Sequence, residues 1–242
     1  MKPKKDNCSL MPASRFFGDD ALIAFTSDAS IDFTPADFDA PLTQSQRVYL
    51  KARTGTEVPQ VFWRRQVHGD GVVVAQGNAA DCRAYPDADA FVTNKPGLPI
   101  AIRTADCVPV FVFDPLKRVI ALAHAGWKGT CKQIAAKTVK TMQDKFGCQC
   151  YDLRITLGPS IRPCCYEVSE EFLDYFPRDT QKRDGRFYAD MIAANRRQLI
   201  DAGIRPVNIF DSGVCTACDQ NYFSFRRDGE KAGRMISLMV LL

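Results

Sequence analysis

Two long runs of β-forming apolar residues follow one another in the middle of the chain. The first is Leu98–Phe113, LPIAIRTADCVPVFVF, and the second is RVIALAHAG, which begins after an Asp114-Pro115 turn and stops at Gly126. Uninterrupted apolar runs between turn residues are typical of buried strands. The first run also contains a polar island, RTADC, at residues 103–107. We therefore expect two buried strands with polar groups placed at a break between apolar segments.

Further elements alternate with these strands. A helix is predicted from about Thr130 to Phe146, because its apolar residues recur at spacings of three and four. Two more helices are predicted over about 170–176 and 188–202, and the second should end at Gly203. The remaining segments that are typical of strands are residues 21–26, two runs within 61–76, RITLGPSI, NIFDSG, NYFSFRR and GRMISLMVLL.

The domain organisation is simple. The 242 residues contain 46% hydrophobic residues, enough to fill a core, and they show no linker, repeat or low-complexity tract. We therefore predict one α+β domain over residues 1–242 with a mixed sheet core.

The charge and the apolar pattern limit the partners and the location. The formal net charge is +4, and the basic residues are scattered, so no nucleic-acid partner is expected. No stretch has the roughly 18 apolar residues of a membrane helix, and Asp19 and Asp20 interrupt the basic N-terminus before a signal-peptide core. We expect a cytoplasmic protein without a membrane partner. In a reducing compartment its ten cysteines are free thiols, metal ligands or a nucleophile.

The two histidines of the chain and one cysteine suggest a shared centre. His68 and His124 occupy short glycine-flanked ends of apolar strands, and Cys107 lies in the polar island between them in sequence. Two imidazoles and one thiolate form a recognised zinc set that leaves a fourth position for water or substrate. Bound zinc lowers the pKa of its water towards about 7. The alternative is that the histidines cap strand ends and Cys107 is a core thiol.

Six longer motifs occur in order along the chain: QVHGDGVV, DADAFVT, TADCVPVFVFDP, ALAHAGWKGT, GPSIRPCCYEV and CTACDQNYFSFRRDGEKAGR. They resemble the YfiH family, also called laccase-domain or polyphenol-oxidase-like proteins. The resemblance covers about residues 61–242, and residues 1–60 are divergent. It implies a layered α/β/β/α fold similar to the catalytic domain of cytotoxic necrotizing factor toxins. It also implies zinc ligands at His68, Cys107 and His124, and purine nucleoside phosphorylase activity.

Other polar residues near these motifs are candidates for the same site. Asp106 precedes Cys107, and its carboxylate could move protons or orient a ligand, which makes it a candidate catalytic residue with Cys107 and His124. Arg103 shares the polar island and suits phosphate; its alternative partners are Asp87 and Asp89.

Candidates for substrate binding also follow the second histidine and lie near the C-terminus. Trp127 could stack on a purine, or simply pack in the core, and Lys128 could hold phosphate. Arg226 and Arg227 fall in a predicted strand, where consecutive side chains point to opposite faces, so at most one should face the pocket.

Six further cysteines form three close pairs: Cys148 with Cys150, Cys164 with Cys165, and Cys215 with Cys218. The last pair is a Cys-x-x-Cys motif, but a closed zinc site needs two more ligands. Adjacent or alternating cysteines are poor chelators, so we expect core or surface thiols at all six positions.

The leading functional hypothesis is a zinc-dependent purine nucleoside phosphorylase or adenosine deaminase, with a small nucleoside and phosphate as partners. One alternative is a copper polyphenol oxidase, which is disfavoured because a multicopper site needs many histidines and this chain has two. Another is a hydrolase or peptidoglycan-editing amidase that uses Cys107 and His124 without metal. A fourth is a binding module with a structural metal. The sequence leaves the preferred nucleoside and the oligomeric state open.

Overall fold

The computed structural model describes residues 17–242 except residue 20 and residues 36–39. Its largest sheet is mixed, with the order β11-β7-β5-β6-β3-β2. The central pair, β5 and β6, is antiparallel, whereas β11 pairs in parallel with β7 and β2 pairs in parallel with β3. The strands of this sheet are β2 (Val72–Val74), β3 (Ala90–Thr93), β5 (Val108–Asp114), β6 (Val119–Ala125), β7 (Arg154–Leu157) and β11 (Ile209–Asp211).

A smaller antiparallel sheet packs on one face of the large sheet. Its order is β1-β12-β4, and its strands are β1 (Leu22–Thr26), β12 (Met235–Leu241) and β4 (Ile100–Thr104). Between the two sheets lies a core of large apolar side chains. Phe91, Phe111 and Phe113 come from the large sheet, and Ile102 and Met239 come from the small one.

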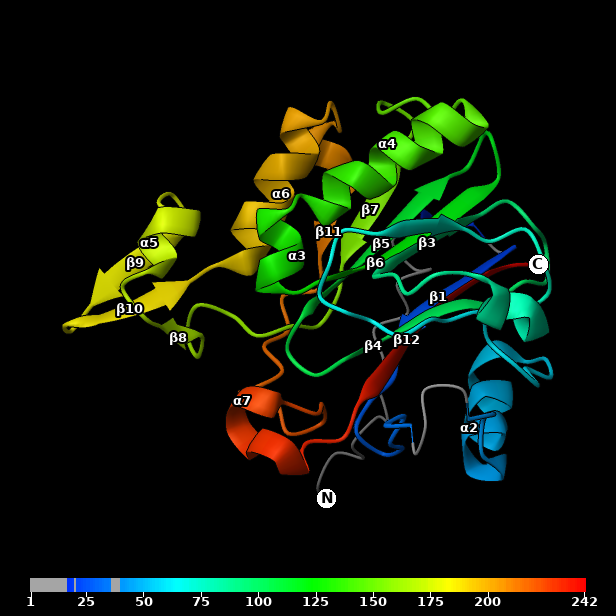
Figure 1. Ribbon diagram of the computed structural model, residues 1–242, viewed down its shortest axis with the longest axis horizontal. Helices are drawn as coiled ribbons and strands as arrows, with labels where there is room; N and C mark the ends of the chain where they lie inside the picture. The colour runs from blue at the N-terminus through cyan, green and yellow to red at the C-terminus, as the bar shows by residue number, and fades with distance from the viewer. Residues whose placement is uncertain (1–16, 20, 36–39) are drawn as a thin grey trace, which may run out of the picture.

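Helices cover the outer faces of both sheets, as Figure 1 shows. The helices α3 (Trp127–Cys131), α4 (Ile134–Phe146) and α6 (Met191–Asp201) lie over the large sheet, and α2 (Gln44–Thr54) lies against the small one. The buried face of α4 carries the predicted Ile134, Ala135, Thr138, Val139 and Met142. These layers confirm the expected α/β/β/α arrangement and the mixed sheets.

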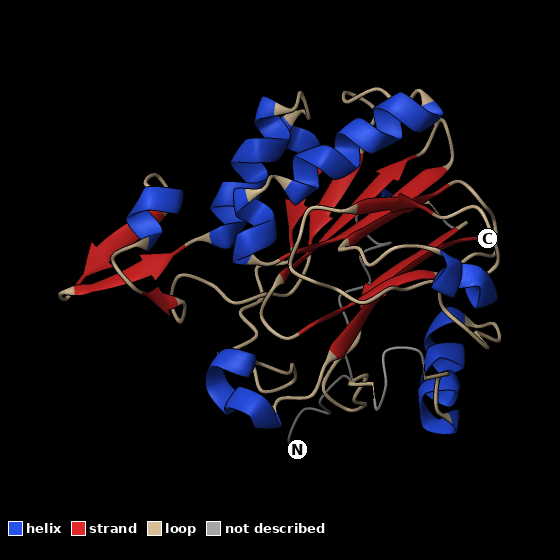
Figure 2. Cartoon of the chain, viewed as in Figure 1, coloured by secondary structure: helices blue, strands red, loops and turns tan. Residues whose placement is uncertain are grey.

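A small arm projects from the body of the molecule at the left of Figures 1 and 2. It contains the strands β8 (Glu167–Val168), β9 (Thr180–Arg183) and β10 (Arg186–Ala189) and the short helix α5 (Phe172–Tyr175). The arm follows β7 in the chain and leads into α6. Short 3-10 turns, η1 (Ala79–Ala84), η2 (Pro206–Asn208) and η3 (Gly229–Lys231), complete the described elements.

The structure corrects four sequence-based expectations. Residues 61–67 contain an isolated bridge at Phe62 instead of a strand, and the predicted helix from Thr130 is two helices separated at Gln133, whose φ is +63°. The helix predicted over 188–202 begins at Met191, because its first residues belong to the hairpin of β9 and β10. The predicted strand NYFSFRR is instead the short helix α7 (Phe225–Asp228), because the Ser224 side chain caps it by accepting from the Arg227 N–H.

The other predicted strands are found at β1, β2, β4, β5, β6, β7, β11 and β12. Among the described residues, no helix combines the length and the apolar character that are needed to cross a membrane.

Candidate metal centre

His68, Cys107 and His124 converge on one point, which we call the His-Cys-His centre. Their donor atoms lie within 4.8 Å of one another, and the two imidazole centroids are 4.8 Å apart. The sheet register explains the convergence. Cys107 immediately precedes β5, and Pro109 pairs with His124 of β6, while His68 lies in the loop before β2. The end of the antiparallel pair thus presents sulfur and imidazole side by side.

A buried carboxylate holds two of these three residues in place. Asp89, fully buried beside β3, accepts hydrogen bonds from the backbone N–H groups of Val67, His68 and Gly69. Its Oδ1 also lies 2.8 Å from Nδ1 of His124. Burial raises the pKa of Asp89, but these hydrogen bonds outweigh burial and hold the pKa below its usual value. The contact occupies Nδ1 of His124 and leaves Nε2 as the donor for a metal.

Gly126 allows the ligands to approach the backbone closely. A Cβ atom at this position would lie 3.0 Å from Sγ of Cys107 and 3.1 Å from Cδ2 of His68. Both separations are shorter than ordinary van der Waals contacts. The glycine that ends β6 therefore sets the spacing between sulfur and imidazole.

The cysteine and the buried histidine form a charged pair. Burial raises the pKa of the Cys107 thiol, but the charges and hydrogen bonds of His124 and His68 outweigh burial and lower it to about 6. Burial lowers the pKa of His124, but Cys107 and Asp89 outweigh burial and raise it to about 9. The thiolate form that binds metals is therefore favoured at neutral pH.

The carboxylate of Asp106, a predicted catalytic group, holds two loops together. Its Oδ1 accepts from the hydroxyl of Thr216 at 2.6 Å, and its Oδ2 accepts from the backbone N–H of Arg226 at 2.6 Å. Its own carbonyl accepts from Ile161 at 2.9 Å. The φ of Asp106 is +93°, so the backbone bends at this residue and does not continue as a regular extended strand. These contacts give Asp106 a positioning role, and a proton-moving role stays a prediction.

A pocket of about 550 Å³ lies between the arm and the body of the molecule, and its lining residues are Trp127, Tyr166, Glu167, Val168, Ser169, Phe172 and Arg226. Its wall includes Trp127, which follows Gly126, and Tyr166. Burial and then the charge of Cys107 raise the pKa of Tyr166 to about 12. Phe172 of the arm packs on Trp127 with ring centroids 5.3 Å apart. The arm thus supplies one wall of an aromatic pocket.

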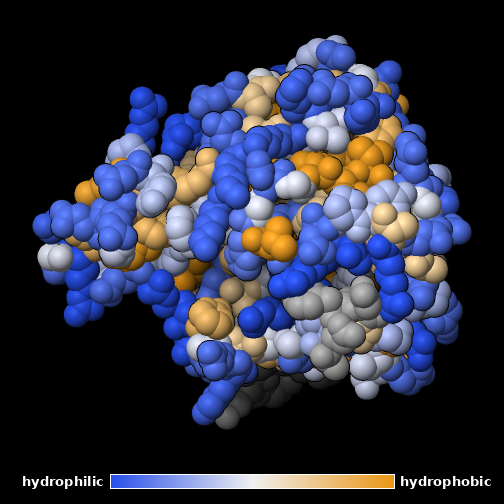
Figure 3. Space-filling view, viewed as in Figure 1, coloured by the Kyte–Doolittle hydropathy of each residue, from blue (hydrophilic) through white to orange (hydrophobic). Residues whose placement is uncertain are grey.

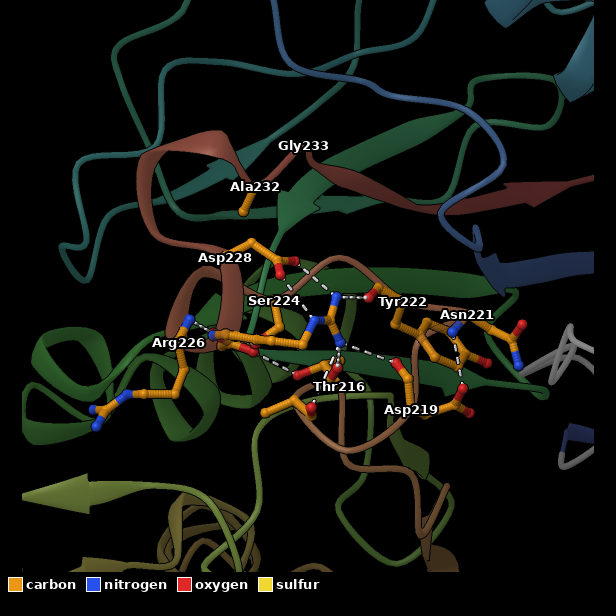
Figure 4. Close-up of polar contacts among 12 residues, drawn as sticks. Thr216, Asp219, Asn221, Tyr222, Ser224, Arg226, Asp228, Ala232 and Gly233 are labelled. Carbon is orange, nitrogen blue, oxygen red and sulfur yellow. Dashed lines mark hydrogen bonds and ion pairs between the residues drawn. The ribbon is translucent and has the colours of Figure 1, made fainter.

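The two adjacent arginines near the C-terminus have different surroundings. Arg226 lines the pocket, and its guanidinium lies 5.3 Å from the centroid of the Tyr166 ring. Figure 4 shows the Arg226 side chain directed away from the neighbouring network. Arg227 instead donates to the Thr216 and Tyr222 carbonyls and pairs with Asp228. Arg226 is therefore the one of the two that is placed to meet a ligand.

Lys128 and Arg103, the other predicted phosphate contacts, also differ in their distance from the pocket. Lys128 is exposed, with Nζ 5.5 Å from the centroid of the Trp127 ring, and so lies near the pocket. The buried Arg103 stacks on Trp63 at 4.6 Å, on the face of the small sheet that packs towards α2. Its predicted alternative partners are occupied elsewhere, because Arg64 pairs with Asp87 and Asp89 holds the centre. The structure thus brings Lys128 towards the site but places Arg103 on another face.

The sequence analysis missed Asp89 and Tyr166 as site residues. A signal for Asp89 existed, because DADAFVT places a carboxylate directly before the apolar residues Ala90, Phe91 and Val92 of a buried strand. It also missed a second set of donors. Cys164, Cys165, Cys215 and Cys218, which we call the four-cysteine cluster, have sulfur atoms within 4.8 Å of one another. Cys148 is buried and Cys164 and Cys218 are exposed, which agrees with the expected core and surface thiols, but the gathering of four sulfur atoms was not predicted.

The fold is a layered α/β/β/α arrangement in which Cys107 and His124, at the end of a buried strand pair, gather with His68 into a candidate metal site. A family model described as multi-copper polyphenol oxidoreductase laccase matches residues 29–242. The match begins 32 residues before residue 61, the start of the resemblance carried by the motifs. The chain belongs to this laccase-like, YfiH family.

Individual relatives agree with this assignment. The chain is 33% identical over 218 residues to the Bacillus subtilis (strain 168) protein named purine nucleoside phosphorylase YlmD, covering 84% of this chain and 78% of the relative. It is 33% identical over 212 residues to a protein named adenosine deaminase RL5 from an unknown prokaryotic organism, covering 81% and 80%. The crystal structure of Bacillus licheniformis hypothetical protein YfiH superposes with a TM-score of 0.84 at 27% identity, covering 98% of each chain.

Proposed function

We propose that this protein is a zinc-dependent enzyme that acts on purine nucleosides, by phosphorolysis, by deamination of adenosine, or by both. The observation that carries the proposal is the His-Cys-His centre beside an aromatic pocket that contains Arg226. The names of the relatives, purine nucleoside phosphorylase and adenosine deaminase, support the substrate class.

The donor set fits zinc. Zinc bonds of about 2.0–2.3 Å in a tetrahedral site place donor atoms about 3.3–3.8 Å apart. The donor atoms of these three residues lie within 4.8 Å of one another, which is compatible with this geometry. His68 is exposed, Cys107 is half-buried and His124 is buried, so one side of the centre is open to solvent. Three protein ligands with an open side are typical of catalytic zinc. Bound zinc would supply Lewis acidity and a nucleophile at neutral pH.

The pocket residues have separate tasks in this proposal. Trp127, Tyr166 and Phe172 provide flat apolar surface for a purine ring, and the pocket volume is in the range of small-molecule sites. Arg226 and Lys128 are the cations that are near enough to hold phosphate at the pocket rim. Asp89 fixes the orientation of His124, and Asp106 fixes the loops that carry Thr216 and Arg226.

One experiment tests the substrate and the reaction together. The purified protein is analysed for bound metals and is then supplied with adenosine or inosine, with and without phosphate. We expect zinc in the protein, release of base from both nucleosides only with phosphate, and conversion of adenosine to inosine without phosphate. A protein that acts on neither nucleoside, in its zinc-loaded form, would contradict the proposal.

The laccase-like description of the family favours one other candidate, a copper polyphenol oxidase. The chain contains two histidines in total, which limits the imidazole ligands for a multicopper centre. Oxidation of a phenol by the copper-loaded protein, at a rate above that of free copper, would favour this candidate over the nucleoside enzyme.

The metal-free alternative, a hydrolase or peptidoglycan-editing amidase, uses Cys107 as nucleophile and His124 as base. It makes the opposite prediction for metal removal. A chelator should abolish the zinc-dependent reaction but should leave a cysteine hydrolase active.

A further inference from the structure

The four-cysteine cluster lies outside the His-Cys-His centre and uses none of its residues. Sγ of Cys218 is 3.2 Å from Sγ of Cys165 and 3.6 Å from Sγ of Cys164. All four sulfur atoms lie within 4.8 Å of one another, and none of the four cysteines is in a disulfide. Fifty or more residues separate the two pairs along the chain, so the fold brings the sulfur atoms together.

The first pair lies on a turn that directs both side chains the same way. The backbone N–H groups of Cys165 and Tyr166 both donate to the Arg162 carbonyl, which closes a turn over residues 162–165. In an extended strand, adjacent side chains would point to opposite faces. The turn removes that restriction, so adjacent cysteines can contribute two ligands to one site.

The second pair is held opposite the first by contacts that do not involve sulfur. The backbone of Cys215 forms an isolated parallel bridge with Ser160, and Thr216 N–H donates to the Ser160 carbonyl at 3.1 Å. The guanidinium of Arg162 pairs with both carboxylate oxygens of Asp211 and donates to the Val214 carbonyl. The protein therefore sets the separation of the two loops before any ligand binds.

The sulfur separations match a metal better than they match four independent thiols. Zinc bound to four thiolates at about 2.3 Å places neighbouring sulfur atoms about 3.8 Å apart. The observed 3.2 Å and 3.6 Å, with an outer limit of 4.8 Å, surround this value. Four sulfur donors in a tetrahedral arrangement are typical of zinc or iron.

A basic side chain lies next to the cluster. The Arg183 side chain donates to the Pro163 carbonyl, next to Cys164, and so brings a positive charge near the cluster. A tetrathiolate zinc site carries a net charge of about −2, and nearby amide N–H groups and guanidinium groups offset it.

We propose that Cys164, Cys165, Cys215 and Cys218 form a second, closed zinc site that fastens together the two loops behind the pocket. On binding, each protonated thiol releases its proton to water, and all four positions of the metal are filled by sulfur. The site has no open position and therefore a structural role. It acts on the pocket through its neighbours in sequence, because Tyr166 follows Cys165 and Thr216 follows Cys215.

Metal content per chain tests the proposal. The full chain is purified under reducing conditions, with excess zinc removed, and zinc is counted together with iron. We expect two zinc ions per chain, falling to one in Cys218→Ser and in Cys165→Ser. Cys107→Ser should also retain one zinc ion, now in the four-cysteine cluster. Cys150→Ser is the matched control, because this half-buried cysteine lies outside both sets, and it should keep two.

A rescue variant separates loss of a ligand from loss of structure. Cys218 is exposed, so substitution there leaves the core unchanged. Cys218→His restores a zinc donor, and we expect it to regain the second zinc ion that Cys218→Ser lacks. The cobalt-loaded Cys107→Ser protein should show the tetrahedral bands and the intense sulfur-to-cobalt charge transfer of four thiolates.

Three results would overturn the proposal: the same zinc content in Cys218→Ser as in the parent, iron in place of zinc at the cluster, or a metal-free cluster whose cysteines form disulfides under reducing conditions. These results are independent of nucleoside turnover. Failure of the proposed function would leave the zinc count of the cluster unchanged, and failure of the cluster would leave the zinc of the His-Cys-His centre in place.

Discussion

The His-Cys-His centre and the four-cysteine cluster both gather soft donor atoms, but the chain builds them in different ways. In the first, Cys107 and His124 belong to adjoining ends of two paired, buried strands, and Asp89 fixes the imidazole. In the second, all donors lie on a turn and a loop that Arg162 and Asp211 tie together. The first has three donors and an open side next to a pocket, and the second has four donors. The roles that we propose for the two sites therefore rest on the number of donors and on access to them more than on the type of donor.

The largest effect is expected for Cys107→Ser, which removes the only sulfur donor of the His-Cys-His centre. A serine hydroxyl stays protonated where the thiol ionises, so zinc is held poorly. We expect kcat/KM for nucleosides to fall by more than about a hundredfold, since ligand loss should exceed the 10- to 100-fold effect of changing a residue behind a ligand. Cys150→Ser is the control. Parent-like turnover in Cys107→Ser would show that the open centre is not the reacting site.

The next effect is expected for Asp89→Asn, which keeps the shape of the side chain but removes the charge that orients His124. Changes of this kind reduce metal affinity or activity about 10- to 100-fold. Zinc competition with a chelator measures the affinity at the open centre, and the zinc of the four-cysteine cluster should not change. Asp87→Asn is the control, because Asp87 pairs with Arg64 at the surface. Equal zinc affinities in Asp89→Asn and Asp87→Asn would show that Asp89 does not contribute to metal binding at the His-Cys-His centre.

Arg226→Ala tests whether the pocket beside the His-Cys-His centre contains a separate contact for phosphate. Arg226 lines the pocket next to the centre, and a bidentate contact to phosphate contributes about 1.5–3 kcal/mol. We expect the phosphate concentration needed for half-maximal phosphorolysis to rise roughly 10-fold or more, while deamination of adenosine changes little. Arg47→Ala, on the exposed face of α2, should change neither. Equal loss of both reactions in Arg226→Ala would argue against a separate phosphate contact.

The smallest effect is expected for Asp211→Asn, which breaks the ion pair behind the four-cysteine cluster. Burial raises the pKa of Asp211, but Arg162 and the Gly213 N–H outweigh burial and hold the pKa below its usual value. A carboxyl with a lowered pKa in the folded state stabilises the protein above its unfolded pKa of about 3.9 and loses this contribution as the pH falls through the folded pKa.

At pH 7 we expect the free energy of unfolding of Asp211→Asn to be about 1 kcal/mol lower than that of the parent protein. The effect is small because the ion pair is partly exposed. The difference should shrink below about pH 4. Denaturant unfolding at several pH values measures it, with Asp144→Asn as the control at an exposed ion pair on α4. A difference that stays constant down to pH 2 would show that the charge of Asp211 contributes nothing.

The sequence predicts the two regions unequally for physical reasons. The strands that carry Cys107 and His124 are long apolar runs, and a polar group at the end of such a run is conspicuous. The four-cysteine cluster depends on a local turn at residues 162–165 and on a parallel bridge between Ser160 and Cys215, which lie 55 positions apart in the sequence. Local patterns do not encode such a contact. The β9 and β10 hairpin is similar, because most of β9 is exposed and polar and shows no apolar alternation.

The backbone of Asp106 has a consequence for motion. A non-glycine residue at a φ of +93° stores conformational strain of about 1–3 kcal/mol, which its hydrogen bonds to Thr216, Arg226 and Ile161 offset. When one of these hydrogen bonds breaks, the strained backbone of Asp106 can relax, and this weakens the remaining hydrogen bonds. The contacts are therefore expected to open together. In amide hydrogen exchange, the N–H groups of Ile161 and Arg226 should open as one unit, although 65 positions separate them in the sequence. The pocket wall should then open and close in a single cooperative step, because Asp106 links the segments that carry Ile161 and Arg226.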